Sequence, residues 1–243
     1  MKQDIFSYLR GNRYPGRGIL LGRAGDTAVL AYFIMGRSEN SRNRIFVPTE
    51  DGIRTQAKDP AKMQDPSLVI YHPVRQVGGD VVVTNGDQTD TIRDFLTRGE
   101  SFEAALRTRE FEPDYPNCTP RISGILRRGG SYTLSILKAD GTLCQRQFFE
   151  YLAQSGVGHF ISTYQGDGNP LPSFAGEPIA VALEESDPAK LAARLWESLN
   201  DENRVSLFVR SIDMHTGGAR TKVINRYGED WESAQSEGES FDA

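Results

Sequence analysis

Three strand-like segments joined by tight turns fill residues 121–149 and constrain the fold more than any other feature of the sequence. Gly129-Gly130 and Asp140-Gly141 separate these segments, and such dipeptides favour the turns of antiparallel hairpins. Strands joined by tight turns pair antiparallel, because a parallel pair needs a long crossover connection. The middle of the chain is therefore predicted to be a β-meander.

Similar hairpin signals occur elsewhere in the chain. Gly25-Asp26 separates a predicted strand that begins at Arg17 from one that ends at Met35. Further strands are expected at residues 44–48, 53–55, 68–71, 81–84, 159–164, 205–212 and 220–225. Helices are expected at residues 2–10, from Asp90 or Thr91 to Thr97, after Ser101 and after Asp187-Pro188. About ten strands in hairpins and four helices predict the α+β class with largely antiparallel sheets.

The charge is distributed unevenly along the chain, although its net value is only -5. Residues 229–243 contain six of the 33 acids and no base, which leaves 27 acids against 28 bases in residues 1–228. No repeat or linker divides that larger part. We expect a single domain at residues 1–228 and a disordered acidic tail at residues 229–243.

Composition argues against several classes of protein. Lys and Arg are not clustered as in a nucleic-acid-binding domain, and no apolar run reaches membrane-spanning length. Residues 1–4 do not open a signal peptide, and two cysteines are too few for a disulfide framework. We expect a cytoplasmic protein with no nucleic-acid or membrane partner.

A polar segment rich in arginine follows the apolar run that ends at Met35 and continues to Ile45. Arg37, Arg42 and Arg44 lie in it with serine and asparagine residues that are typical of loops. A guanidinium presents a planar fork of donors that matches a phosphate or carboxylate. The segment is therefore a candidate anion pocket, and the alternative is a polar loop with solvated arginines.

Several common catalytic patterns are missing from the sequence. There is no Walker loop, no dinucleotide-binding glycine fingerprint and no GxSxG elbow. His72, His159 and His215 are isolated, and we expect structural or surface roles for them. Cys118 is expected to pack, since no neighbouring base marks it as a nucleophile. The sequence predicts neither a metal site nor a cofactor.

The remaining candidates are carboxylates, amides and a tyrosine. Glu112 and Asp114 are two residues apart in a proline-bounded loop, where a solvated turn is the alternative explanation. Tyr71 ends an apolar segment, and core packing with a satisfied hydroxyl explains it equally. Turn and helix-cap chemistry explains three further polar residues: Asn85, Thr89 and Asp90.

Five segments follow one another between residues 14 and 165. They are residues 14–19 (YPGRGI), 35–44 (MGRSENSRNR), 84–90 (TNGDQTD), 112–122 (EPDYPNCTPRI) and 161–164 (ISTY). In type and order they resemble the archaeal-type inosine monophosphate (IMP) cyclohydrolase family. Its members close the six-membered ring of 5-formamidoimidazole-4-carboxamide ribotide to give IMP and water. The resemblance implies a purine ribotide as the small-molecule partner and leaves a homo-oligomer open.

The reacting groups of this substrate share one molecule, so the resemblance implies no metal, cofactor or covalent nucleophile. The enzyme would position the formyl group, stabilise the developing oxyanion and move protons. The resemblance assigns catalysis to Glu112, Tyr71 and Arg37. It leaves open whether Asp114 rather than Glu112 transfers the proton, and which arginine faces the phosphate. The residues implied in substrate binding are Arg17, Arg37, Ser38, Asn43, Arg44, Asn85, Thr89, Asp90, Asp114, Asn117, Arg121, Thr163 and Tyr164.

The family's fold resembles that of the N-terminal-nucleophile hydrolases, a four-layer αββα sandwich of two largely antiparallel sheets between helices. The sequence begins Met-Lys-Gln-Asp, so we expect that scaffold without a self-cleaving nucleophile. Two alternatives stay open. One is an amide hydrolase on the same scaffold, which needs a nucleophile such as Cys118. The other is a non-catalytic purine-nucleotide-binding protein. The loop at residues 165–178 has no assigned role.

Overall fold

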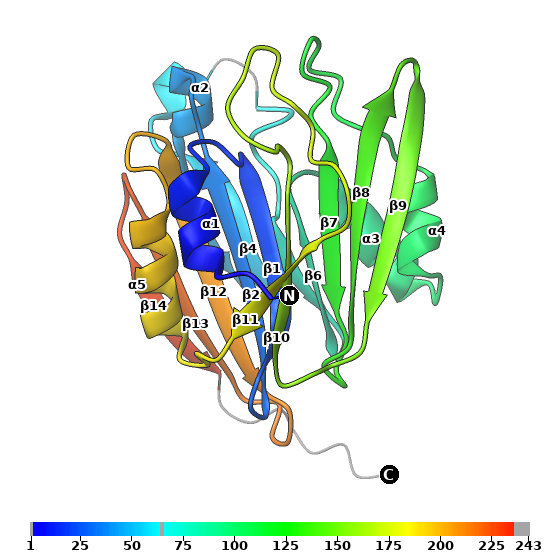
Figure 1. The fold of residues 1–243 in the computed structure, drawn as a ribbon, viewed down its shortest axis with the longest axis vertical. Coiled ribbons are helices and arrows are strands. Elements are labelled where there is room, and N and C mark those ends of the chain that lie inside the picture. Colours follow the sequence, from blue (N-terminus) through cyan, green and yellow to red (C-terminus); the bar gives the residue numbers. More distant parts are fainter. Residues whose placement is uncertain (1, 64–65, 236–243) are drawn as a thin grey trace.

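Two seven-stranded sheets lie face to face, with helices on their outer sides (Figure 1). The computed structural model describes residues 2–63 and 66–235. The helices are α1 (Ile5–Gly11), α2 (Glu39–Arg42), the 3-10 helix η1 (Pro60–Lys62), α3 (Gln88–Thr97), α4 (Phe102–Arg107) and α5 (Pro188–Ser198). The strands are β1 (Arg17–Ala24), β2 (Thr27–Met35), β3 (Arg44–Thr49), β4 (Gly52–Ala57), β5 (Val74–Val77), β6 (Asp80–Thr84), β7 (Arg121–Leu126), β8 (Tyr132–Asp140), β9 (Leu143–Tyr151), β10 (Gly156–Ser162), β11 (Ile179–Leu183), β12 (Arg204–Asp213), β13 (Ala219–Asn225) and β14 (Trp231–Gln235).

The two sheets differ in how the chain builds them. Sheet B is a meander in chain order, β3-β4-β5-β6-β7-β8-β9. Sheet A has the order β11-β10-β1-β2-β12-β13-β14, so that distant segments flank its first hairpin. Neighbouring strands in both sheets are antiparallel throughout the described residues. The expectation of largely antiparallel sheets joined by hairpins is confirmed.

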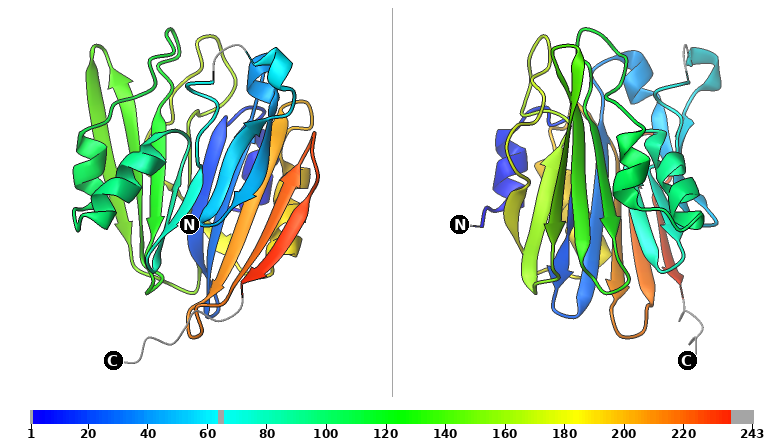
Figure 2. Two further views of the ribbon diagram at one scale, coloured as in Figure 1. Left: turned by 180° about the vertical axis from the view of Figure 1, so that it is seen from behind. Right: turned by 90° about the vertical axis from the view of Figure 1, so that its right-hand side faces the viewer.

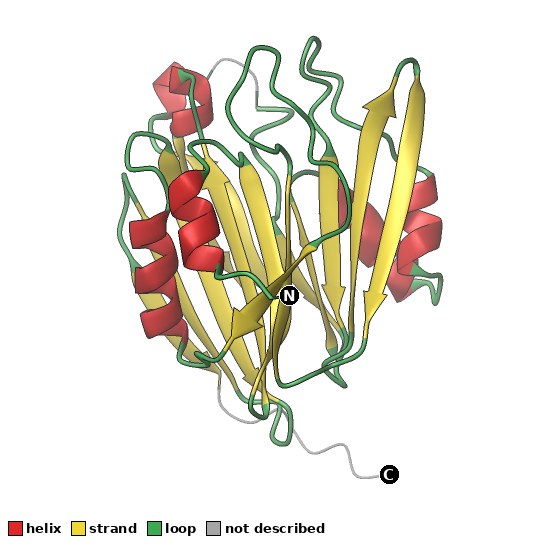
Figure 3. Cartoon of the chain, viewed as in Figure 1, coloured by secondary structure: helices red, strands yellow, loops and turns green. Residues whose placement is uncertain are grey.

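The helices make the outer two of four layers. Helices α1 and α5 cover sheet A, while α3 and α4 cover sheet B on the opposite side (Figures 2 and 3). Three apolar clusters fill the spaces: one between α1, α5 and sheet A, one between the sheets, and one between sheet B and α3 and α4. This arrangement confirms the predicted αββα sandwich.

Strand β2 shows why the sequence folds in this way. Its side chains alternate between two apolar environments, because successive residues of a strand point to opposite faces. Leu30, Tyr32 and Ile34 belong to the cluster between the sheets, whereas Ala31 and Phe33 belong to the cluster under the helices. A strand buried on both faces reads as a continuous apolar run, as this one does.

Side-chain caps fix the beginnings of several helices as predicted. Ser101 accepts a hydrogen bond from the backbone of Ala104 at the start of α4. Asp187 caps α5 through two backbone N–H groups, and Pro188 occupies the first helical turn. Helix α3 begins earlier than expected, at Gln88 rather than after Asp90 or Thr91.

The predicted strand at residues 68–71 is wrong, and these residues form a turn. The side chain of Tyr71 is buried, and its backbone bonds Thr55 of β4: its carbonyl accepts from the N–H of Thr55, and its N–H donates to Oγ1 of Thr55. The strand of this region is β5, which pairs with β6 through residues 74–77. Strand β11 was also not predicted.

The prediction that the chain is disordered from residue 229 onward places the start of the tail too early. Trp231–Gln235 forms β14, which pairs with β13 and is the edge strand of sheet A. Glu232 of β14 forms an ion pair with Lys222 at 3.0 Å, and Asp230 accepts a hydrogen bond from the backbone of Asn225. Residues 236–243 lie outside the described residues. None of the described helices is both long and apolar enough to cross a membrane.

Candidate active site

Many predicted site residues lie at one end of the space between the sheets, the upper end in Figure 1. Strands β1 and β7 begin at this end, next to the ends of β2, β6 and β10. Three connections also meet there: the segment with α2, the segment between α4 and β7, and the loop after β10. Antiparallel pairing therefore brings together segments that are far apart in the sequence.

A buried ion pair joins Arg17 of β1 to Glu112 in the segment that precedes β7. Nη2 of Arg17 lies 3.0 Å from Oε2 and 3.1 Å from Oε1 of Glu112. The side chains are only 11% and 3% exposed, respectively. Nδ2 of Asn85 also donates to Oε1 of Glu112 at 3.1 Å. All of these partners are donors, so the surroundings of Glu112 are suited to the ionised carboxylate.

Asn85 is held rigidly between sheet B and helix α3. Its Oδ1 accepts hydrogen bonds from the backbone N–H of Ile122 at 2.8 Å and from Nε2 of Gln88 at 3.0 Å. Its Nδ2 also donates to the carbonyl of Pro120 at 3.0 Å. As predicted, the Asn-Gly turn leads from a strand into a helix, and its asparagine also bonds Glu112.

The electrostatic environment of the pair is set by burial and by opposite charge. Burial raises the pKa of Glu112 above its ordinary value, and the charge of Asp114 also raises it. The charges of Arg17 and Arg121 lower the pKa but do not cancel the rise. For Arg17, burial lowers the pKa, but the Glu112 carboxylate and the hydroxyls of the nearby tyrosines together outweigh burial, so the pKa lies well above the ordinary value. Arg17 stays charged, and Glu112 is a carboxylate that takes up a proton more readily than an exposed one.

Tyrosine hydroxyls lie around this pair. The hydroxyls of Tyr32 and Tyr71 are 2.9 Å apart, and both rings are buried. Burial raises the pKa of Tyr32, and the neighbouring Tyr71 adds to the effect. Tyr71, Tyr32 and Tyr164 all act electrostatically on Arg17, which places the three phenols near the pair.

Tyr164 connects the site to Asp114. Its hydroxyl lies 2.6 Å from Oγ1 of Thr119, which in turn bonds the carboxylate of Asp114. Asp114 also accepts from the backbone N–H of Thr119 at 2.6 Å. Both oxygens of Asp114 are thus used within its own loop, whereas those of Glu112 face residues of other elements.

Arg121 forms a second polar group beside Asn85. Its Nη1 donates to Asp87 and to Oε1 of Gln88, each at 2.7 Å. The Nε atoms of Arg17 and Arg121 are buried, and the described residues give neither of them a hydrogen-bond acceptor. A buried donor without an acceptor is costly, so both arginines are suited to a ligand that supplies oxygen atoms.

Arg37 lies at the outer edge of the site rather than inside it. Its side chain is 38% exposed, pairs with Asp167 at 2.6 Å and donates to the carbonyl of Gly168 at 2.9 Å. Its guanidinium also lies 5.0 Å from the ring centre of Tyr14, which stacks on Tyr164. Arg37 therefore connects the 165–178 loop to the buried tyrosines.

The 165–178 loop is fixed by contacts on both sides. Oδ1 of Asn117 accepts a hydrogen bond from the backbone of Leu171, and Asn12 donates to the carbonyl of Gln165. Leu171 and Phe174 are buried. The predicted residue Asn117 thus holds this loop over the site.

Six other predicted residues have local partners. The backbone of Asp59 satisfies the amide of Asn43 at both ends, and Ser38 caps α2. Thr89 bonds Thr84, and Asp90 pairs with Arg75. The last two of the six, Arg44 and Thr163, are buried and bonded to backbone atoms. Nε of Arg44 donates to the carbonyl of Ser41, and Oγ1 of Thr163 accepts from the N–H of Arg17. Substrate contacts by these six residues stay a prediction.

The sequence did not single out Tyr32 or Thr119, although both contact predicted residues. Tyr32 lies in the middle of an apolar run and resembles ordinary core. The signal for it was the period of two along β2, which places the phenol on the face toward sheet B. Thr119 had no comparable signal, because its role depends on how the proline-rich loop folds back.

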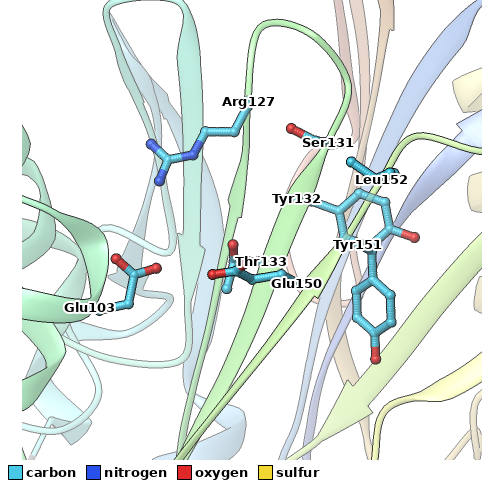
Figure 4. A pocket seen from close by; sticks show the side chains of 8 residues that line it. All are labelled: Glu103, Arg127, Ser131, Tyr132, Thr133, Glu150, Tyr151 and Leu152. Atoms are coloured by element: carbon cyan, nitrogen blue, oxygen red, sulfur yellow. The ribbon is translucent and has the colours of Figure 1, made fainter.

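The cavity in Figure 4 lies elsewhere and contains none of the predicted site residues. It has a volume of about 510 Å³ and is lined by Glu103 of α4 and by residues around β8 and β9, including Thr133 and Glu150. Among the described residues no group of three or more His, Cys, Asp or Glu side chains is placed to hold a metal ion.

Among the described residues, neither His159 nor Cys118 is bonded to the polar cluster around Glu112. His159 is stacked on Tyr151 and bonds the hydroxyl of Tyr132 through Nδ1, and burial lowers its pKa to about 4. Cys118 is a free cysteine with a φ of 43°, and within the described part of the chain no base is bonded to it. The structural roles expected for these two residues agree with this geometry.

Comparison with known proteins identifies the family. Residues 14–217 match the model of a family described as IMP cyclohydrolase-like protein. The chain is 32% identical over 177 residues to the IMP cyclohydrolase of Halobacterium salinarum (strain R1), covering 71% of this chain and 84% of that protein. It is 31% identical over 179 residues to the IMP cyclohydrolase of Methanopyrus kandleri, covering 72% and 84%. For the enzyme of Methanococcus maripaludis (strain C7) the identity is 27% over 158 residues, covering 63% and 75%.

The match to the family model includes the five segments on which the resemblance rested and extends beyond them to residue 217. The fold agrees with the architecture that the resemblance implied. The chain belongs to the IMP cyclohydrolase-like family.

Proposed function

We propose that this protein is an IMP cyclohydrolase, which closes the purine ring of 5-formamidoimidazole-4-carboxamide ribotide to give IMP and water. The family match and the named relatives support this activity. One observation in the structure carries it: the Glu112 carboxylate, buried and held by Arg17 and Asn85, lies in a cluster with several phenol groups. Such a cluster can position a substrate and move protons.

The reaction needs little beyond positioning, electrostatics and proton transfer. The carboxamide nitrogen attacks the formyl carbon of the same molecule, and its weak nucleophilicity makes alignment and removal of its proton important. Glu112 accepts that proton and can return it to the former formyl oxygen. That oxygen leaves as water with this proton and the one that the formamido nitrogen loses when the ring C=N bond forms. Tyr71, whose hydroxyl is paired with that of Tyr32, donates to the formyl oxygen as charge develops on it.

The arginines bind the anionic part of the ribotide in this proposal. Arg37 and Arg44 lie on either side of α2, and Arg17 lies deeper, next to Glu112. A remote phosphate supplies binding energy that holds the reacting groups in place. Binding of the ribotide by arginine side chains in this way requires no cofactor in the site.

The direct test is the absorbance change on cyclisation, followed with purified protein, the formylated ribotide and a metal chelator. We expect turnover to continue in the chelator. IMP binding without any turnover would instead indicate the non-catalytic nucleotide-binding alternative, and turnover that returns only with a divalent ion would contradict the metal-free mechanism.

Replacing Arg37 by alanine should weaken IMP binding roughly ten- to a hundredfold, because a hydrogen bond to a charged group contributes about 1.5–3 kcal/mol. Isothermal titration with IMP measures this change. The matched control is Asp167→Asn, which removes the partner of Arg37 but keeps the guanidinium, and it should bind IMP at least as well as the parent. Equal affinity of Arg37→Ala and the parent would remove Arg37 from the site.

Replacing Cys118 by alanine should leave most of the turnover intact, because the proposed cyclisation forms no covalent intermediate. Cys118 is partly buried in the loop between Asp114 and Thr119, so only a small packing cost is expected. A folded Cys118→Ala protein that binds IMP but has lost turnover would favour the amide hydrolase alternative.

A further inference from the structure

Arg210 of β12 lies on the face of sheet A that points toward sheet B. Its neighbours at a spacing of two, Phe208 and Ile212, pack in the cluster between the sheets, whereas Leu207 and Val209 pack under the helices. Arg210 follows the same alternation and is only 4% exposed. A charged side chain thus lies in a layer that is otherwise largely apolar.

No carboxylate of the described residues neutralises Arg210. Its Nε donates to Oγ1 of Thr221 at 3.0 Å, and its guanidinium lies 5.4 Å from the ring centre of Phe208. Burial lowers its pKa, and no acidic group opposes that effect. By contrast, the buried guanidinium groups of Arg17 and Arg121 each bond a carboxylate. A buried charge without an opposite charge is costly, so its retention calls for an explanation.

Arg210 lines a cavity of about 990 Å³ at the end of the molecule opposite the candidate active site. This is the lower end in Figure 1, where β12 leads into β13. Short side chains leave room there, with Ala28 and Ala219 from sheet A and Gly78 and Gly79 from the turn between β5 and β6. The volume lies in the range of small-molecule sites.

Most other charged groups that line this cavity already have ion-pair or hydrogen-bond partners. Asp51 is bonded by Arg75 at 2.6 Å, and Arg127 pairs with Asp80 at 2.9 Å. Asp213 accepts two backbone N–H groups of its own turn, at 2.9 Å each. Glu50 and Arg128 are exposed at the rim and have opposite charges. Asp213, like Glu50 and Arg128, is exposed, so Arg210 is the buried charged group of this cavity that no opposite charge of the described residues pairs with.

We propose that this cavity binds a phosphate group, either as the free ion or as part of a small organic phosphate, with Arg210 as its principal ligand. The guanidinium fork offers paired donors that match phosphate oxygens, and Arg128 at the rim adds a second fork. A bound phosphate would place a negative charge next to the guanidinium of Arg210, which no carboxylate of the described residues bonds. The site lies at the other end of the sandwich from Glu112 and shares no residue with the proposed active site.

The test compares the binding of inorganic phosphate and of AMP to the parent protein, Arg210→Met and Arg210→Lys by isothermal titration. We expect Arg210→Met to weaken binding at the cavity at least tenfold, with Arg210→Lys in between. Met replaces an unpaired buried charge by an apolar chain of similar length, so the variant should fold. Turnover of the formylated ribotide by Arg210→Met, measured without phosphate, should be unchanged, and unchanged turnover shows that the variant is folded.

Arg220→Met is the matched control. Arg220 lies on the neighbouring strand β13 but is exposed and pairs with Asp187 next to α5, so its replacement leaves the cavity intact. Tighter binding of AMP than of inorganic phosphate, at a site that Arg210→Met weakens, would identify an organic phosphate as the ligand, and equal binding at that site would identify the free ion. The proposal is overturned if Arg210→Met binds both probes like the parent.

If Arg210→Met does not fold, crystals of the parent soaked in tungstate decide the question. Anomalous density next to the guanidinium of Arg210 supports the site. Density found only at the other end of the molecule, or nowhere, contradicts it.

Discussion

Replacing Glu112 by glutamine should lower turnover by about 10²–10⁴-fold while leaving the affinity for IMP almost unchanged. Glutamine keeps the size of the side chain and one acceptor for Arg17, so the loss reports the missing proton acceptor rather than a change of shape. Steady-state turnover and IMP titration on the same preparation measure the two quantities separately.

Asp114→Asn and Tyr71→Phe are the comparisons for this variant. The oxygens of Asp114 are bonded within its own loop, so Asp114→Asn should affect folding of the loop more than proton transfer. Turnover of Glu112→Gln equal to that of the parent would refute the assignment of Glu112. A loss confined to Asp114→Asn would transfer the role to Asp114.

The pH dependence of turnover gives an independent check of Glu112. A general base must be ionised, and burial raises the pKa of Glu112, so turnover should decline as the pH falls through a value above the ordinary 4.5. In Glu112→Gln the residual turnover should lack this acidic limb. An identical limb in both proteins would assign it to another group.

Replacing Arg17 by methionine should lower the free energy of unfolding by about 3–5 kcal/mol, because it leaves the Glu112 carboxylate buried without its partner. Urea unfolding followed by tryptophan fluorescence measures the loss. Arg13→Met is the matched control: Arg13 pairs with Glu202 at 2.8 Å, but both side chains are more than 60% exposed, so the expected loss is at most about 1 kcal/mol.

The double variant Arg17→Met/Glu112→Gln tests whether the loss comes from the unpaired charge. It removes both charges together and should be more stable than Arg17→Met alone. If the double variant instead loses the sum of the two single effects, the two residues do not stabilise the fold as a pair.

The fold class was predicted from local turn signals, and the structure has turns at these positions. The Gly-Gly and Asp-Gly turns of the meander and the Gly25-Asp26 hairpin each connect antiparallel strands. Errors arose where tertiary contacts decide. Residues 68–71 have the composition of a strand but form a turn, because Thr55 satisfies the backbone of Tyr71. The acidic composition of residues 229–243 hid the strand at residues 231–235, which pairs with the edge that β13 offers.

The candidate site was harder to predict than the fold, because its geometry depends on contacts between the sheets. The type of Glu112 and of Arg17 indicated acid–base and anion chemistry, but nothing in the sequence showed that they form one buried pair. Asn43 and Asp90 have the same residue types as Asn85 and Asp114, and the structure directs them to other partners. Residue type identifies candidates, and only the packing of distant strands selects among them.

The edge of sheet A carries a practical consequence for shortening the chain. The family match ends at residue 217, before β13 begins, although β13 buries Val223 and Thr221 against the rest of the sheet. A protein trimmed to the matched residues would expose the backbone of β12, an open edge that can pair with other chains and aggregate. Expression of a soluble core should therefore retain the chain through Gln235, where β14 supplies an edge strand that bears Glu232.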